Sequence, residues 1–242
     1  MSKRMNRYDH RLQNQLRPVK LDIGFQSYAE GSVLIKMGDT HVICSASVEE
    51  TVPPFLKDQK KGWITAEYNM LPRSTLTRTR REQIKKGRTH EIQRLIGRCL
   101  RTAVDLTAIG ERSILIDCDV IQADGGTRTA SITGGYVALY IAIQDLVNKN
   151  KIDVMPSISQ IAAISVGIIE NEVLLDLCYE EDSSADSDFN IVMNNEGDFI
   201  EVQGTAEHRP YSKTLLEKVL SVASAGIEQL FAFQNEVIYK AN

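Results

Sequence analysis

The hydrophobic pattern of the chain runs from strands to a helix twice, and this repeated order restricts the fold more than any other feature. Apolar runs of strand length fill residues 19–48, and apolar residues then recur at helical spacing over residues 88–106. Two further strand-length runs, at 161–169 and 172–177, precede a long helical pattern over residues 212–233. Two such units in succession predict an α/β sandwich made of two related halves.

Short turn signals separate the expected strands. Gly38 and Asp39 divide residues 29–48 into two β-rich runs, as in a hairpin, and Glu170-Asn171 occupies the equivalent place in the second half. The remaining expected elements are strands at 63–68, at 113–123 and on both sides of Asn195-Glu196-Gly197, and a buried apolar helix at 129–146. We expect one domain, with a first half over about residues 1–147 and a second over about 157–242.

The composition, with 43% hydrophobic and 25% charged residues, is typical of a soluble globular protein. No apolar run approaches the roughly 18 to 20 residues that span a bilayer, and no apolar segment follows the basic N-terminus. We therefore expect a cytoplasmic protein with no membrane partner. The four cysteines show no C-x-x-C spacing and the histidines no zinc-ligand spacing, so we expect buried thiols and no structural zinc.

Charge is sorted into patches. The net charge of -4 argues against a protein that coats nucleic acid non-specifically, yet residues 73–101 hold ten Lys or Arg against two Glu. The tract at 73–88 is rich in arginine and threonine, which favours a flexible loop along an RNA backbone, because phosphate contacts supply most sequence-independent affinity. A charged surface loop is the alternative interpretation.

Two segments have the features of phosphate sites. D-G-G-T-R-T at 124–129 stands between a strand and a helix, where unpaired N–H groups, close-approach glycines and an arginine favour an anion. Arg88 begins the other helix and would face the same anion if the two helix starts converge. The alternatives are a plain connecting turn and a solvated arginine at a helix end.

An acidic run lies far from the basic one. Five carboxylates fall between Glu180 and Asp188, and such crowding needs a cation or a buried proton to relieve the repulsion. A turn through Ser183, Ser184 and Ala185 would bring Asp182 and Asp188 together as a pair suited to Mg²⁺. An acidic surface loop is the alternative. Beside a phosphate turn and a basic tract, the pair favours phosphoryl chemistry.

Seven motifs are spread along most of the chain, from residue 15 to residue 207. They are Q-L-R-P-V from residue 15, S-A-S-V-E-E-T-V-P-P-F-L at 45–56, W-I-T-A-E-Y-N-M-L-P-R at 63–73, G-R-T-H-E-I-Q-R-L-I-G-R at 87–98, I-D-C-D-V-I-Q-A-D-G-G-T-R-T-A-S-I-T-G at 116–134, E-D-S-S-A-D-S-D at 181–188 and E-V-Q-G-T-A-E at 201–207. Together they closely resemble the ribonuclease PH family. The resemblance implies an α/β fold of the ribosomal protein S5 domain 2-like class and a homohexamer built as a trimer of dimers.

The resemblance also implies the activity and its residues. Such an enzyme trims the 3′ ends of tRNA precursors, and orthophosphate instead of water attacks the last phosphodiester to release a nucleoside 5′-diphosphate. The residues implied for orthophosphate are Arg88, Gly126, Thr127 and Arg128; those for the divalent metal and catalysis are Asp182 and Asp188; those for RNA are Arg73, Arg78, Arg80 and Arg81. The expected metal is Mg²⁺, with Mn²⁺ as the alternative.

Three positions depart from the family pattern. His10 and His208 stand where the family usually has Gly, and Cys178 stands where it commonly has Asp. If either Gly adopts positive φ, a His there costs on the order of 1 kcal/mol. We expect none of the three to touch the proposed phosphate or metal residues, and so expect effects on subunit packing or substrate affinity.

Two other classes of protein with this broad fold are alternatives. A non-catalytic RNA-binding ring subunit of an exosome-like assembly tends to lack the paired acids and the phosphate arginines, which this chain has. A small-molecule kinase would need a glycine-rich ATP loop, and the sequence contains none.

Overall fold

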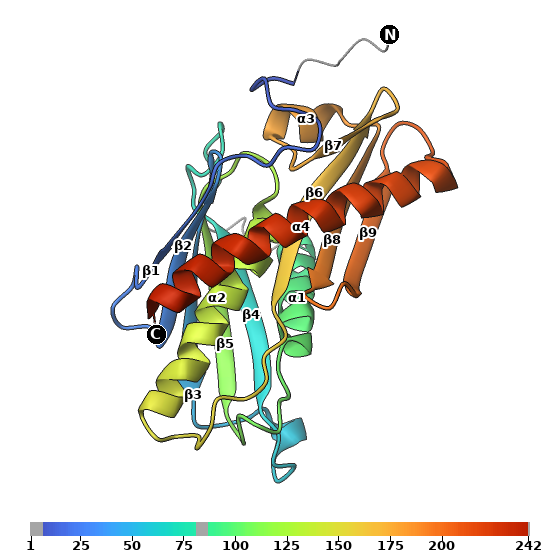
Figure 1. The fold of residues 1–242 in the computed structure, drawn as a ribbon. Coiled ribbons are helices and arrows are strands. Elements are labelled where there is room, and N and C mark those ends of the chain that lie inside the picture. The colour runs from blue at the N-terminus through green and yellow to red at the C-terminus, as the bar shows by residue number, and fades with distance from the viewer. Residues whose placement is uncertain (1–6, 81–86, 242) are drawn as a thin grey trace.

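The computed structural model describes residues 7–80 and 87–241, which form two β-sheets and the helices packed on them (Figure 1). This arrangement confirms the predicted α/β fold. The first sheet has the order β1-β2-β3-β5-β4 and the second the order β7-β6-β8-β9. The strands of the first sheet are β1 (Val19–Ile23), β2 (Gly31–Met37), β3 (Thr40–Glu49), β4 (Trp63–Met70) and β5 (Ser113–Gln122). Those of the second are β6 (Ile161–Ile169), β7 (Glu172–Leu175), β8 (Ser187–Asn194) and β9 (Phe199–Ala206).

Both predicted hairpins are present. Met37 pairs with Thr40 across the first turn, where Gly38 has a φ of 56°. Glu170 and Asn171 both adopt positive φ between β6 and β7, which matches the right-handed twist of the flanking strands. The second sheet is antiparallel throughout, whereas β4 runs parallel to β5 and is joined to it through helix α1 (Gly87–Thr102).

Helix α2 (Thr127–Asn148) is the centre of the core. It packs against β2 and β3 of the first sheet and against β6 of the second. Contrary to the expectation from the sequence, α2 is long and apolar enough to cross a membrane, but 72% of its most apolar window is buried inside the fold. It is therefore a core helix. All four cysteines are free and buried, as predicted.

Helix α4 (Lys213–Ala241) crosses both halves of the molecule (Figure 1). It contacts β1 of the first sheet and β6, β7 and β8 of the second, so one helix covers the junction between the sheets. The predicted end near Phe233 was too early.

Two further boundaries differ from the prediction. Helix α1 ends at Thr102 instead of residue 106, because the chain leaves the helix to pair Val104 with Ile158. The acidic run expected as a turn forms a short helix, α3 (Tyr179–Ser184). Ala185 caps the end of this helix, and β8 begins two residues later.

A buried glutamine joins α4 to both halves. The Gln234 side chain is fully buried, and its amide donates to the carbonyl oxygens of Thr133 in α2 at 3.0 Å and Ile161 in β6 at 2.9 Å. Its Oε1 accepts from Nε2 of Gln160 at 2.9 Å. A buried polar group that loses its hydrogen-bond partner destabilises the folded state.

We expect Gln234→Leu to lower the free energy of unfolding by about 1–3 kcal/mol, because the buried groups of Gln160, Thr133 and Ile161 each lose a hydrogen bond to Gln234. Chemical denaturation measures the change. Gln229→Leu is the matched control, since Gln229 is an exposed glutamine of the same helix. Equal losses in the two variants would contradict this role for Gln234.

Candidate active site

A pocket of about 840 Å³ lies where the starts of α1 and α2 meet α3, β8 and β9. Its lining includes Arg88, Arg128, Asp182 and Asp188. The two arginines come from the first half of the chain and the two aspartates from the second. The structure thus brings together four of the ten residues that the sequence predicted for a site.

The two arginines occupy equivalent positions, each being the second residue of its helix. Nη1 of Arg128 lies 3.7 Å from Oε1 of Glu91 and donates to Oε1 of Gln203 at 3.3 Å. Gln203 in turn donates to Glu91 at 3.3 Å. These contacts hold the Arg128 guanidinium between α1 and β9, at the wall of the pocket.

The other two residues predicted for phosphate lie just before Arg128 and do not line the pocket. Gly126 caps the start of α2 with a φ of 64°, and the Thr127 hydroxyl hydrogen-bonds the Tyr68 hydroxyl at 2.8 Å. Among the described side chains, none forms a capping hydrogen bond at this helix start. The helix therefore presents backbone N–H groups and its positive end toward the region of Arg128.

The aspartates are coupled electrostatically to each other and to the arginines. Removal from water raises the pKa of Asp182, the charge of Asp188 raises it further, and Arg88 and Arg128 act in the opposite direction. Removal from water and the charge of Glu207 likewise raise the pKa of Asp188. A cation would relieve this repulsion, and a pair of carboxylates beside open pocket volume is the hard oxygen donor set that Mg²⁺ prefers.

A second group of possible metal ligands lies at the start of α3. Ligand atoms of Asp124, Cys178 and Glu180 all fall within 4.8 Å of one another. Burial raises the pKa of the Cys178 thiol to about 11, so at neutral pH it is a thiol and not the thiolate that metals bind. Asp124 is already paired with Arg17. This group is therefore a structural contact.

Three of the four residues predicted to bind RNA are described, and none of these three lines the pocket. Arg73, Arg78 and Arg80 are exposed in the segment between β4 and α1, and Nη1 of Arg73 donates to the Leu76 carbonyl at 2.7 Å. Arg81 lies outside the described residues. In sequence, this segment precedes Arg88, the second residue of α1, which lines the pocket.

The departures from the family pattern have separate outcomes. His10 does adopt the left-handed conformation, with a φ of 62°. Cys178 precedes α3, and its N–H donates to Glu181 at 3.1 Å. His208 lines the same pocket as Asp188, whereas His10 and Cys178 do not line it.

The sequence interpretation also missed Glu91, Gln203 and Glu207, which line the pocket. Glu91 follows Arg88 by three residues in a helix, and Gln203 and Glu207 recur at even spacing in a strand-like segment. Both spacings put the side chains on one face of their helix or strand, so the sequence contained a pattern that could have identified these residues.

Comparisons with known proteins agree with the geometry. The sequence models of the 3′ exoribonuclease family match the chain over residues 15–143 for domain 1 and 159–226 for domain 2. The chain is 56% identical over 236 residues to the ribonuclease PH of Dehalococcoides mccartyi, covering 96% of this chain and 99% of that relative. It is 54% identical over 235 residues to the ribonuclease PH of Solibacter usitatus, covering 96% and 99%.

Solved structures share the fold at lower identity. The Archaeoglobus fulgidus exosome with RNA bound to the active site matches with a TM-score of 0.80 and 20% identity, over 94% of this chain and 92% of that one. Rice (Oryza sativa) Rrp46 matches with a TM-score of 0.76 and 20% identity, over 95% and 98%. These likenesses are consistent with the predicted ribosomal protein S5 domain 2-like fold. Together with the family models and the near full-length relatives, they lead to one assignment: the chain belongs to the ribonuclease PH family of 3′ exoribonucleases.

Proposed function

We propose that the pocket is the phosphorolytic active site of a 3′-to-5′ exoribonuclease, in which orthophosphate shortens RNA by one nucleotide at a time. The observation that carries this proposal is the meeting of two guanidinium groups and two carboxylates, from opposite halves of the chain, in one 840 Å³ pocket. A non-catalytic ring subunit is the weaker alternative. The exosome structures are only 20% identical to this chain, and this chain has both the arginine pair and the aspartate pair.

The arginines solve an electrostatic problem in this reaction. An oxygen of orthophosphate must attack the terminal phosphorus of RNA, although both groups are anionic. Arg88 and Arg128 neutralise the attacking phosphate, and the start of α2 adds N–H groups through the Gly126-Thr127 turn. A bond forms from an orthophosphate oxygen to the terminal phosphorus of the RNA. The bond from that phosphorus to the 3′ oxygen of the preceding nucleotide breaks, and the proton released by orthophosphate is taken up by that 3′ oxygen. The products are a nucleoside 5′-diphosphate and a shortened RNA, and the reverse step is nucleotidyl transfer.

Asp182 and Asp188 are the residues that would hold Mg²⁺, with Mn²⁺ as the alternative. When bound, the ion would supply positive charge for the scissile phosphate. The carboxylates themselves stand close enough to the arginines to interact with them, so the two pairs bring opposite charges to one reacting centre. No side chain needs to become covalently attached to the RNA.

The remaining proposals concern substrate and assembly. Arg73, Arg78 and Arg80 would guide the RNA strand toward the pocket together with Arg81, and binding would weaken steeply with salt. We propose tRNA precursors as substrates, a homohexamer built as a trimer of dimers, a single domain over residues 1–242, and a cytoplasmic location. A ring would let several basic loops share one RNA.

The reaction is tested by digesting an RNA with a short single-stranded 3′ tail in Mg²⁺, with and without orthophosphate. We expect nucleoside 5′-diphosphates only when orthophosphate is present. We expect Arg128→Ala to raise the KM for orthophosphate about ten- to a hundredfold, the effect of losing one charge-assisted hydrogen bond.

Arg94→Ala is the control for that variant, since Arg94 is exposed on α1 and does not line the pocket. Nucleoside monophosphates released without orthophosphate would identify a hydrolase and refute the proposal. An unchanged KM in Arg128→Ala would place the anion site elsewhere.

The aspartate pair should limit stability while it supports activity. Both folded-state pKa values are raised, so the protonated forms favour folding and stability falls as pH rises through those values. We expect the double variant Asp182→Asn and Asp188→Asn to lose turnover, to keep RNA binding, and to melt at a higher temperature than wild type at pH 7.

Thermal unfolding at pH 7 and at about pH 3.5, with and without Mg²⁺, measures this. The advantage of the variant should shrink at the lower pH, and Mg²⁺ should raise the melting temperature of wild type alone. Equal stabilisation of both proteins by Mg²⁺ would remove the aspartates from the metal site.

A further inference from the structure

Arg17 links the two halves of the site from behind. Its side chain is buried, and it donates from Nε and Nη2 to the two carboxylate oxygens of Asp176, at 3.1 Å and 2.7 Å. Its Nη1 donates to the carbonyl oxygen of Asp124 and lies 3.5 Å from an Asp124 carboxylate oxygen. One guanidinium therefore connects Asp124, the residue before the glycine turn of α2, to Asp176 in the segment that leads into α3.

Asp124 makes a second connection between the same elements. Its Oδ1 accepts the N–H of Tyr179, the first residue of α3, at 2.9 Å. The turn itself is fixed to β3, since the Thr40 hydroxyl donates to the Gly125 carbonyl at 2.6 Å and accepts from the Asp124 N–H at 2.9 Å. These hydrogen bonds join the start of α2 to the start of α3.

Asp176 is held in a conformation that few residues adopt. Its φ is 55° and it is 1% exposed, although it is not glycine. Its carbonyl oxygen accepts from Nη2 of Arg7 at 3.1 Å and from Nη2 of Arg11 at 3.0 Å. A left-handed backbone conformation is unfavourable for a residue other than glycine and persists only where its surroundings over-determine it, which is characteristic of functional regions.

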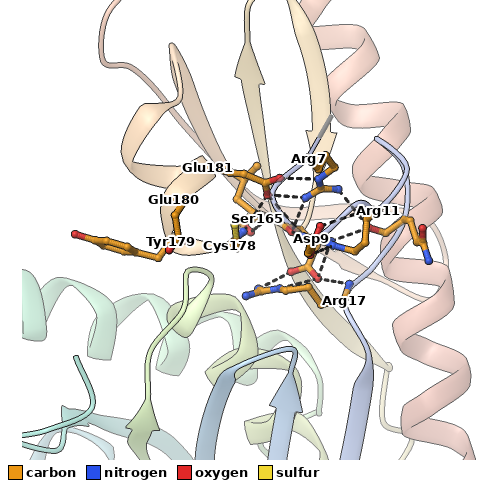
Figure 2. A network of polar contacts seen from close by, with 12 residues as sticks. Arg7, Asp9, Arg11, Arg17, Ser165, Cys178, Tyr179, Glu180 and Glu181 are labelled. Atoms are coloured by element: carbon orange, nitrogen blue, oxygen red, sulfur yellow. Dashed lines mark hydrogen bonds and ion pairs between the residues drawn. The ribbon is translucent and has the colours of Figure 1, made fainter. Parts of the chain in front are cut away.

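Arg7 fixes the rotation of α3. It binds Glu181 through two parallel hydrogen bonds, Nε to Oε1 and Nη2 to Oε2, both 2.7 Å long (Figure 2). Glu181 is 2% exposed and also accepts the Cys178 N–H. Successive residues of a helix point about 100° apart, so holding Glu181 inward determines where Asp182 points. Asp182 lines the pocket.

We propose that Arg17 and Arg7 are positioning residues, which set the distance and orientation of Asp182 relative to the phosphate-binding arginines. Neither lines the pocket, so neither touches substrate. The inference rests on the proposed function, because it gives the buried network a role in that reaction. A displacement of about 1 Å at a reacting centre costs on the order of a hundredfold in rate.

A purely structural lock is the competing explanation, and the test must separate the two. Arg17→Lys keeps the positive charge but has no planar fork to reach Asp176 and Asp124 together. We expect kcat to fall about a hundredfold and the Kd for Mg²⁺, measured by calorimetry with orthophosphate present, to rise at least tenfold. The affinity for RNA should stay as in wild type.

Asp124→Ala is the second variant and keeps the test decisive if Arg17→Lys does not fold. It removes the Tyr179 contact from a half-buried side chain and should shift kcat and the Mg²⁺ affinity in the same direction. Arg112→Lys is the control, since Arg112 pairs with Glu50 away from the pocket. It should leave both quantities unchanged.

Each result decides between the alternatives. If wild type is active and the folded Arg17→Lys and Asp124→Ala variants match it in kcat and in Mg²⁺ affinity, this inference is overturned and the proposed function stands. A wild type without phosphate-dependent turnover would overturn the proposed function and this inference with it.

Discussion

The burial of α2 between the two sheets is the interaction on which the rest of the structure depends. The helix has an apolar surface on nearly every side, and its burial against β2, β3 and β6 supplies the hydrophobic free energy that holds the halves together. Six residues after its start, the Thr133 hydroxyl donates to the Ala163 carbonyl at 3.1 Å and accepts the Ala163 N–H at 3.0 Å, which fixes α2 against β6. Because α2 is fixed there, its start and Arg128 are fixed as well.

Charge is then concentrated at one end of this apolar core. The pocket places arginines of one half against aspartates of the other, and the ion pairs of Arg7 and Arg17 lie behind it. Buried ion pairs seldom add net stability, because taking the charges out of water offsets their attraction. Their value here lies in placing α3 relative to α2, which apolar packing alone does not specify so closely.

Much of the fold was predictable because local periodicity determines it. The hairpins at Gly38-Asp39 and at Glu170-Asn171, the basic α1 and the buried α2 all follow from turn residues and spacing within short windows. The end of α1 was missed because Val104 pairs with Ile158, a contact distant in sequence. Arg88, Arg128, Asp182 and Asp188 were identified from motifs, but only the fold shows that they share a pocket. The Arg7 to Glu181 pair joins residues 174 positions apart, so no local pattern could reveal it.

The central claim is that the arginine pair and the aspartate pair act as one site. Calorimetric titration of orthophosphate, with and without Mg²⁺, tests it most directly, because two ligands that share a site must change each other's affinity equally. We expect Mg²⁺ to tighten orthophosphate binding about tenfold or more in wild type and to have no effect when both aspartates are replaced by asparagine. The same orthophosphate affinity in wild type with and without Mg²⁺ would contradict it.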